Sequence, residues 1–191
     1  MADVTALKRE LAALGAATEA GFEAGGEAVE RIKALAAELE AANPTPNPAS
    51  AAELLRGRWK LLYSSFGLNR NTTLSRLSFN LLPKTPIRVT ELHQEVDPAT
   101  GLYDNAVGYE GGVQVTLGQY VPQSEHRLGV KFTHAQATGH ARVDITNAKI
   151  PPLHSDVTFL DEDFRLNRGG YGNLYVLQLV DRAPARWFRD S

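Results

Sequence analysis

The sequence predicts a mainly β protein, an antiparallel β-barrel preceded by a pair of helices. From Arg58 onward, apolar and polar residues alternate with a period of two in several short segments, which is typical of strands with one face in the core. Before that point, apolar residues recur at helical spacings of three and four. At 191 residues the chain is long enough to bury the core of one domain.

The first segment, residues 1–42, is expected to form the helices. Its two apolar stripes are Val4, Leu7, Leu11 and Leu14, and then Val29, Ile32, Leu35 and Leu39. Gly25 and Gly26 separate the stripes, and each glycine costs about 1 kcal/mol relative to alanine inside a helix, so we expect a break there. The pair should pack on its own domain; docking to a membrane surface or to a partner is the alternative.

Three further segments follow the helices. Residues 43–56 are a linker that starts with three prolines at alternate positions from Pro44, which favours stiff, extended backbone. Residues 57–180 should form the barrel, and residues 181–191 a C-terminal tail.

Nine segments are candidate strands of the barrel. They are residues 58–64, 74–81, 87–96, 102–109, 113–121, 127–133, 142–145, 157–160 and 174–180. Residues 97–101 and 110–112 read as hairpin turns. Short strands at this spacing favour a closed up-and-down barrel over a sandwich. A barrel of about eight strands is just wide enough to be filled by side chains or to hold one small apolar ligand.

Composition excludes several classes of function. The net charge is -2 and the basic residues are dispersed, so no nucleic-acid partner is expected. There are no cysteines, and therefore neither disulfides nor thiolate metal sites. No apolar run reaches the ~20 residues of a membrane-spanning helix, and Asp3 and Glu10 fall where a targeting peptide avoids acids. We expect a cytoplasmic protein without a cofactor.

Three ordered blocks resemble a known family. They are residues 43–48 followed by the Gly-x-Trp segment 54–65, then residues 158–165, and then residues 168–177. Together they are similar to the plastid lipid-associated protein (PAP, or fibrillin) family over residues 29–180. Because no transit peptide is expected, the chain resembles a cyanobacterial member of this family. Gly57 before Trp59 is also typical of the first strand of a lipocalin-type barrel. The tail departs from the family pattern.

The resemblance implies a lipocalin-like barrel without catalytic machinery. It also implies peripheral association with thylakoids or lipid bodies (plastoglobules), and binding or organisation of an apolar lipid, a prenylquinone or a carotenoid. The alternative is an interaction or scaffold protein with a filled barrel, which docks on a membrane or on a prenyl-lipid enzyme.

Trp59 and Arg165 form the first candidate constellation, with Gly57 as a structural residue beside them. In lipocalin-type barrels, a tryptophan of the first strand closes the base and an arginine of the last strands crosses its ring, a cation–π contact worth about 1–2 kcal/mol when desolvated. Arg168 competes with Arg165 for this place.

The acidic run Asp161, Glu162 and Asp163 is read as structural and not as a metal site. On a strand, only Asp161 and Asp163 share a face, and Arg165 and Arg168 are near enough in sequence to pair with them. No metal is expected here, although carboxylates could in principle hold a hard cation.

An apolar set is expected to face the barrel interior, either as a filled core or as the wall of a lipid pocket. It comprises Trp59, Leu61, Tyr63, Val115, Leu117, Val130, Phe132, Phe159 and Val176. An enzyme on the same barrel would need convergent polar groups, for which Tyr63, Glu95 and His134 are the only candidates.

Overall fold

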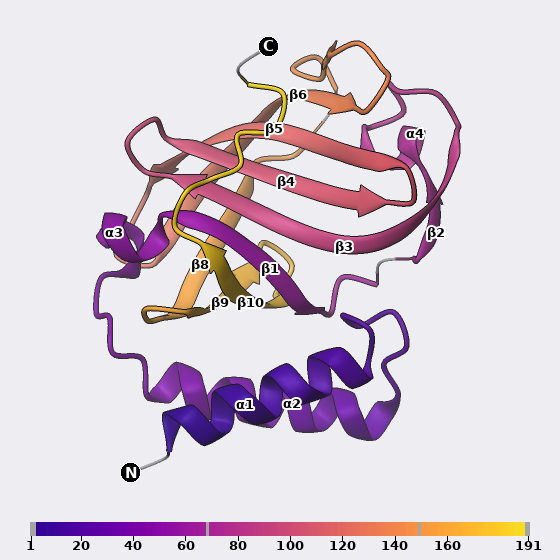
Figure 1. Cartoon of the computed structure of the whole chain (residues 1–191). Coiled ribbons are helices and arrows are strands. Elements are labelled where there is room, and N and C mark those ends of the chain that lie inside the picture. Colours follow the sequence, from indigo (N-terminus) through magenta and orange to yellow (C-terminus); the bar gives the residue numbers. More distant parts are fainter. Residues whose placement is uncertain (1–2, 68, 149, 190–191) are drawn as a thin grey trace.

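A computed structural model describes residues 3–67, 69–148 and 150–189, and in them the chain forms a barrel-like antiparallel sheet beside two helices (Figure 1). The strands are β1 (Gly57–Ser64), β2 (Asn71–Thr73), β3 (Pro86–Asp97), β4 (Leu102–Tyr109), β5 (Gly112–Pro122), β6 (Arg127–Ala137), β7 (Val143–Asp144), β8 (Leu153–Leu160), β9 (Phe164–Gly169) and β10 (Leu174–Asp181). The expected mainly β fold with an N-terminal helical pair is confirmed.

The sheet closes because β1 pairs with β10 on one side and with β3 on the other. Around the ring the order is β1, β10, β9, β8, β6, β5, β4 and β3, while β2 and β7 are short additions to β3 and β6. Closure leaves few free strand edges. The β6–β8 pairing is short and joins only residues 127–130 to residues 153–156. Beyond Val130, β6 continues past the start of β8 and separates from the segment that precedes β8.

Glycines fix three tight places in this ring. Gly101 and Gly111 have φ of 67° and 95° in the two expected hairpin turns, β3–β4 and β4–β5. Gly57, at the start of β1, has φ of 136°, and a Cβ atom there would lie 2.4 Å from the Asp181 carbonyl oxygen. Only glycine fits where β1 crosses the end of β10.

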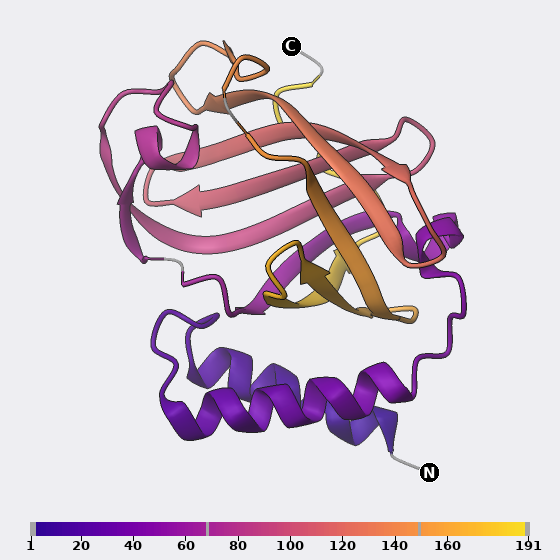
Figure 2. The same ribbon diagram turned by 180° about the vertical axis from the view of Figure 1, so that it is seen from behind.

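Helices α1 (Val4–Ala17) and α2 (Gly26–Ala41) form the expected pair and lie along one side of the barrel (Figure 2). Asp3 caps α1, because its Oδ1 accepts from the Thr5 amide at 3.0 Å. The buried stripes of both helices pack on the outer face of β1, β8, β9 and β10, in a cluster that contains Leu7, Leu11, Ile32, Leu35, Leu39, Phe159, Phe164, Leu166 and Val176. The apolar stripes are therefore used inside the domain.

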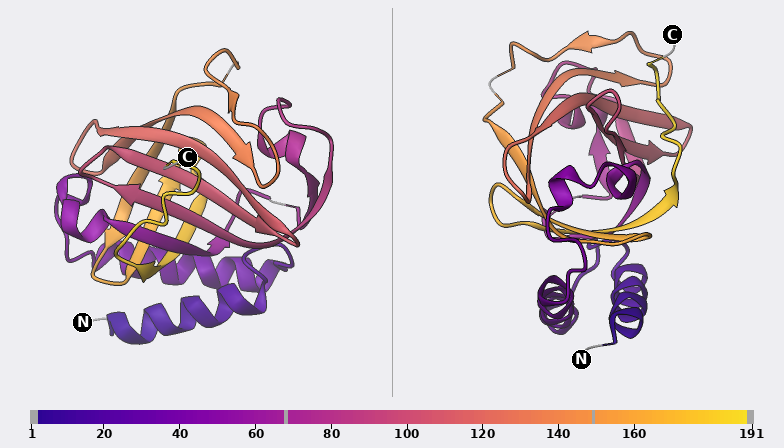
Figure 3. Two further views of the ribbon diagram at one scale, coloured as in Figure 1. Left: turned by 45° about the horizontal axis from the view of Figure 1, so that its top comes forward. Right: turned by 90° about the vertical axis from the view of Figure 1, so that its left-hand side faces the viewer.

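The linker is not extended throughout. Its second half forms the short helices η1 (Pro48–Ser50) and α3 (Ala52–Leu55), and α3 lies across one mouth of the ring (Figure 3, right). Ala49 and Leu55 are buried against Trp59 in the interior cluster. This segment closes one end of the barrel.

Three strand predictions need correction, and one of them is that the short β2 (Asn71–Thr73) was not among the candidates. Residues 74–81 are not a strand: they begin with helix α4 (Leu74–Leu77), capped by Thr73, and Phe79 and Asn80 then take positive φ. Strand β9 was missed because its inward positions are Arg165 and Asn167, so it lacks an apolar inner stripe.

The C-terminal tail crosses the outside of the barrel as a strap. Trp187 and Phe188 pack on Ala106, Val115 and Leu117. Arg189 makes a two-pronged ion pair with the buried Asp104, at 2.8 and 2.6 Å. In the part of the chain that the structure describes, no helix is long and apolar enough to cross a membrane.

Candidate functional site

The expected contact between Trp59 and Arg165 is present at the closed end of the barrel. The guanidinium carbon of Arg165 lies 4.7 Å from the centroid of the Trp59 ring, and both side chains are fully buried. The indole Nε1 donates to the Leu55 carbonyl at 2.9 Å, which ties the ring to α3. Arg182 adds a second guanidinium, 5.9 Å from the ring. Arg168 is elsewhere, paired with Glu40 of α2 at 2.8 Å.

Arg165 belongs to a polar layer inside the barrel. Its Nη2 donates to Oε1 of Gln94 on β3, and the same oxygen lies 3.5 Å from Nδ2 of Asn167. Burial lowers the pKa of Arg165 to about 10, so the side chain is still a cation at neutral pH. Burial raises the pKa of the neighbouring Tyr103, and the charge of Arg165 opposes that shift.

The nine apolar candidates do not form one wall. Trp59 and Val130 lie in the interior cluster, with Leu61 and Phe132 packed against it. Tyr63, Phe159 and Val176 instead lie under the helices, and Val115 and Leu117 lie under the tail. Strand irregularities explain part of this, because the register shifts at Leu61/Tyr63 in β1 and at Val157/Phe159 in β8 move Tyr63 and Phe159 to the outer face. Val115 and Leu117 precede the β5 shift at Leu117/Gly118 and share the outer face by alternation alone.

An apolar groove opens where β6 and β8 separate. Its volume is about 350 Å³, within the ~300–1,000 Å³ of small-molecule sites. The lining is Val121, Gln123, Gly129, Val130, Lys131, Phe132, Ile145, Thr146, Ala148, Ile150, Pro151, Pro152 and Leu153. Three of these residues, Val130, Phe132 and Leu153, also pack in or against the interior cluster around Trp59. The groove therefore borders the barrel core.

A smaller hollow lies near α4, at the other end of the barrel. It has a volume of about 120 Å³ and is lined by Phe22, Phe66, Leu77, Val89, Leu92 and Val107 among others. Phe22 also packs under the Arg70 guanidinium, 4.7 Å from its ring centroid. This volume is below the usual range for a ligand site.

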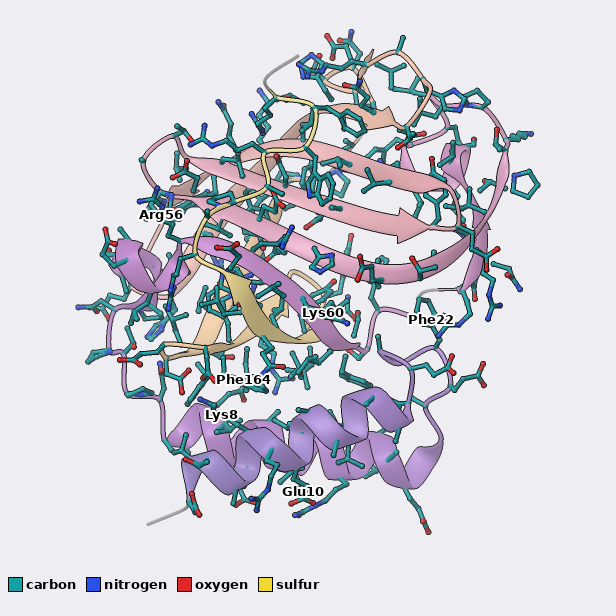
Figure 4. All side chains as sticks on the ribbon, in the orientation of Figure 1. Lys8, Glu10, Phe22, Arg56, Lys60 and Phe164 are labelled. Atoms are coloured by element: carbon teal, nitrogen blue, oxygen red, sulfur yellow. The ribbon has the colours of Figure 1, made fainter. Side chains whose placement is uncertain are left out.

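The acidic run has a different partner from the one expected. Asp161 and Asp163 lie in the turn between β8 and β9 and both pair with Lys8 of α1, the Asp161 contact at 2.8 Å. Lys8 also lies over the Phe164 ring, at the interface of the helices and the barrel (Figure 4). The expected pairing with Arg165 and Arg168 is wrong, because Arg165 points into the barrel and Arg168 contacts α2. Among the described residues, no group of three or more acids and histidines could hold a metal ion.

The three residues considered for catalysis lie apart. Tyr63 is buried under the helices, while Glu95 is buried beneath the tail, where its Oε2 accepts from the Arg186 amide at 3.0 Å. Burial raises the pKa of Glu95. His134 Nδ1 is 3.0 Å from the hydroxyl of the adjacent Thr133. The structure does not bring these three groups together.

Gln94 and Asn167 were not anticipated as site residues. The period-two alternation of strand residues was the available signal. Gln94 lies two positions before Val96 on β3, and Asn167 lies two positions after Arg165 on β9, so both side chains are on the inner face of their strands. Arg186 and Arg189 of the tail had no such signal, because the acids they pair with, Asp97 and Asp104, are 89 and 85 positions away.

Comparison with known proteins gives consistent relatives. The PAP_fibrillin family model matches residues 5–178. A light-induced chloroplastic protein of Solanum demissum is 31% identical, with 92% of this chain and 67% of the relative covered. Probable plastid-lipid-associated protein 2 of Arabidopsis thaliana is 28% identical over 90% of this chain and 69% of the relative, and the chromoplast-specific carotenoid-associated protein of Cucumis sativus is 25% identical, with 92% and 68% covered. No solved structure matches the chain.

Proposed function

The chain belongs to the PAP_fibrillin family, and from this premise we propose that it is a non-enzymatic protein that binds an apolar isoprenoid lipid, a prenylquinone or a carotenoid. The relatives are named as plastid-lipid-associated and carotenoid-associated proteins, which supports a lipid ligand. Relatives named as chloroplastic support a place at the surface of photosynthetic membranes or lipid bodies.

One observation carries the proposal, the groove of about 350 Å³ between β6 and β8. Most of its lining is apolar, so displacing water from it is favourable by about 25 cal/mol per Å² of apolar surface covered. The volume is at the low end of the range for ligand sites. It therefore suits one end of a long isoprenoid, whose remainder would lie along the protein or in a lipid phase.

A substitution in the groove tests this. Ala148 is a small, half-buried lining residue on the loop before β8, so Ala148→Trp fills the groove without replacing a strand residue. Ala141→Trp is the matched control, because Ala141 is exposed on the same connection and does not line the groove. The assay is co-elution of a short-chain prenylquinone, or of β-carotene, with the purified protein on gel filtration.

We expect the wild type and Ala141→Trp to retain pigment or quinone, and Ala148→Trp to retain at least tenfold less. Equal retention by both variants would place the ligand elsewhere. No retention by the wild type would reject the carrier function.

The scaffold alternative rests on a different observation. Phe66, Phe79 and Leu81 are 56, 40 and 46% exposed, and Phe66 lines the hollow near α4 together with Leu77. They suit docking on a lipid surface, whereas the helix stripes are already covered. Flotation with galactolipid vesicles compares the wild type with Phe66→Ser/Leu81→Ser: loss of flotation with unchanged pigment retention favours docking as a separate role.

A further inference from the structure

The interior polar layer holds a cation without an anion. Arg165 is fully buried, and no described carboxylate contacts it. Its Nε and Nη1 have no hydrogen-bond acceptor among the described residues. Nε carries one hydrogen and Nη1 two, so three of the five N–H donors of the guanidinium are unused.

The atoms around the guanidinium repeat this pattern. Oδ1 of Asn167, two positions along the same strand face, also lacks a partner among the described residues. Among the described residues, the only acceptor of the Arg165 guanidinium is the neutral amide oxygen of Gln94. Buried ions are normally paired, and buried polar atoms are normally hydrogen-bonded. This layer therefore has the hydrogen-bond donors and the positive charge that an anionic group would need.

The charges nearby explain why the barrel does not supply its own anion. The buried acids Asp97 and Asp104 are on β3 and β4 but face outward, where the tail arginines Arg186 and Arg189 neutralise them. The groups that face Arg165 from β4 and β5 are Tyr103 and Tyr120, whose raised pKa values keep them neutral at neutral pH. The interior keeps one net positive charge.

The groove borders the cluster that contains the ring on which Arg165 stacks. Val130, Phe132 and Leu153 line the groove and also pack with the cluster that contains Trp59, the residue on which Arg165 stacks. A ligand with its chain in the groove and its polar end turned inward would reach the layer through these three side chains.

We propose that the barrel binds a lipid with a carboxylate head group, whose oxygens accept from the unused N–H donors of Arg165 while the chain lies in the β6–β8 groove. This inference rests on the proposed binding of an apolar lipid in the groove, but it assigns a ligand with a carboxylate, a group that prenylquinones and β-carotene lack. A guanidinium favours carboxylate oxygens as acceptors, and a hydrogen bond between two charged groups is stronger than one to a hydroxyl or a carbonyl.

Gln94→Glu tests the proposal, because it places a carboxylate where Arg165 already donates and so fills the anion's role from within. The control is Gln136→Glu on the outer face of β6, where Gln136 Oε1 accepts from the exposed Arg142 at 3.2 Å. Both variants add one negative charge beside an arginine. Asn167→Asp is a second interior variant, used if Gln94→Glu does not fold.

The probes are palmitic acid, hexadecanol and a short-chain prenylquinone, each competing with a fluorescent lipid on the purified full chain. The wild type and Gln136→Glu should bind the acid about 10- to 100-fold more tightly than the alcohol, the ratio that a charge-assisted hydrogen bond supplies. Gln94→Glu should bring the ratio near one and leave the alcohol unchanged.

The outcomes separate this inference from the proposed function. Equal affinity of the wild type for acid and alcohol overturns the head-group assignment and leaves lipid binding intact, as does a preference that Gln94→Glu retains. Tighter binding of the quinone than of the acid also overturns it. If no lipid binds, the thermal unfolding of the protein is compared with hexanoate and with hexanol. An increase in unfolding temperature that hexanoate causes in the wild type but not in Gln94→Glu supports the anion site without the carrier function. No increase in the wild type rejects both the anion site and the carrier function.

Discussion

Arg165→Met separates two opposing effects of the buried guanidinium. The substitution keeps an unbranched side chain but removes the charge, the contact 4.7 Å above the Trp59 ring and the hydrogen bond to Gln94. A desolvated cation–π contact is worth about 2 kcal/mol, and a hydrogen bond to a charged group about 1.5–3 kcal/mol. Against this loss stands the cost of burying an ion without a counter-ion, which is several kcal/mol.

These terms nearly cancel, so Arg165→Met should change the free energy of unfolding by no more than about 2 kcal/mol. Trp59→Ala should destabilise by about 3–5 kcal/mol, the usual cost of truncating a fully buried tryptophan. In the double variant, the cation–π contact is lost only once. The two single effects should therefore sum to about 2 kcal/mol more than the double effect.

Urea unfolding followed by far-UV circular dichroism measures all four proteins, with linear extrapolation to water. This signal does not depend on the substituted tryptophan. A coupling below about 0.3 kcal/mol would show that ring and guanidinium act independently. A loss above about 4 kcal/mol in Arg165→Met would show that the charge is well compensated in the fold, contrary to the argument from its unused donors.

The remaining predictions concern the frame around the site. Gly57→Ala should destabilise by at least about 2 kcal/mol, because its φ of 136° and the carbonyl 2.4 Å from the new Cβ leave no room; Gly26→Ala, with open space and helical backbone, should stabilise by about 0.5–1 kcal/mol in the same urea titration. Asp161→Asn should lower the free energy of unfolding by about 1 kcal/mol, because it weakens the partly exposed ion pair with Lys8. The same substitution in a Lys8→Met background should have no effect; an equal loss there would exclude the ion pair as the cause. The pKa of Glu95 is raised above its ordinary 4.5, so the folded state holds this proton more tightly than the unfolded state, and the contribution of Glu95 to stability falls as pH rises above 4.5. Glu95→Gln removes that loss, and its unfolding free energy relative to wild type should therefore increase from pH 4 to pH 7; a constant difference would contradict the raised pKa.

The residue pattern determined the elements that local physics controls. Helical spacing predicted the two helices, although α1 ends at Ala17 and the two glycines mark only the start of α2. Period-two alternation with glycine turns predicted the main strands of the ring. The stacking of Arg165 on Trp59 was accessible through the family resemblance, because both residues lie in its matching blocks. The family itself was recognisable for the same reason.

Tertiary structure decided which face each strand residue occupies and which charges meet. Alternation predicts two faces but not where a bulge exchanges them, and so Tyr63 lies outside the barrel interior. Alternation also does not say which face is covered from outside, and Val115 lies on the face that the C-terminal tail covers. Asp161 pairs with Lys8, which lies 153 positions away in the sequence. Arg189 of the tail pairs with Asp104, an acid that no local pattern links to it. The unpaired charge of Arg165 is likewise invisible in the sequence, because pairing depends on what the closed ring brings within hydrogen-bond distance, and that distance is set by long-range packing and not by spacing along the chain.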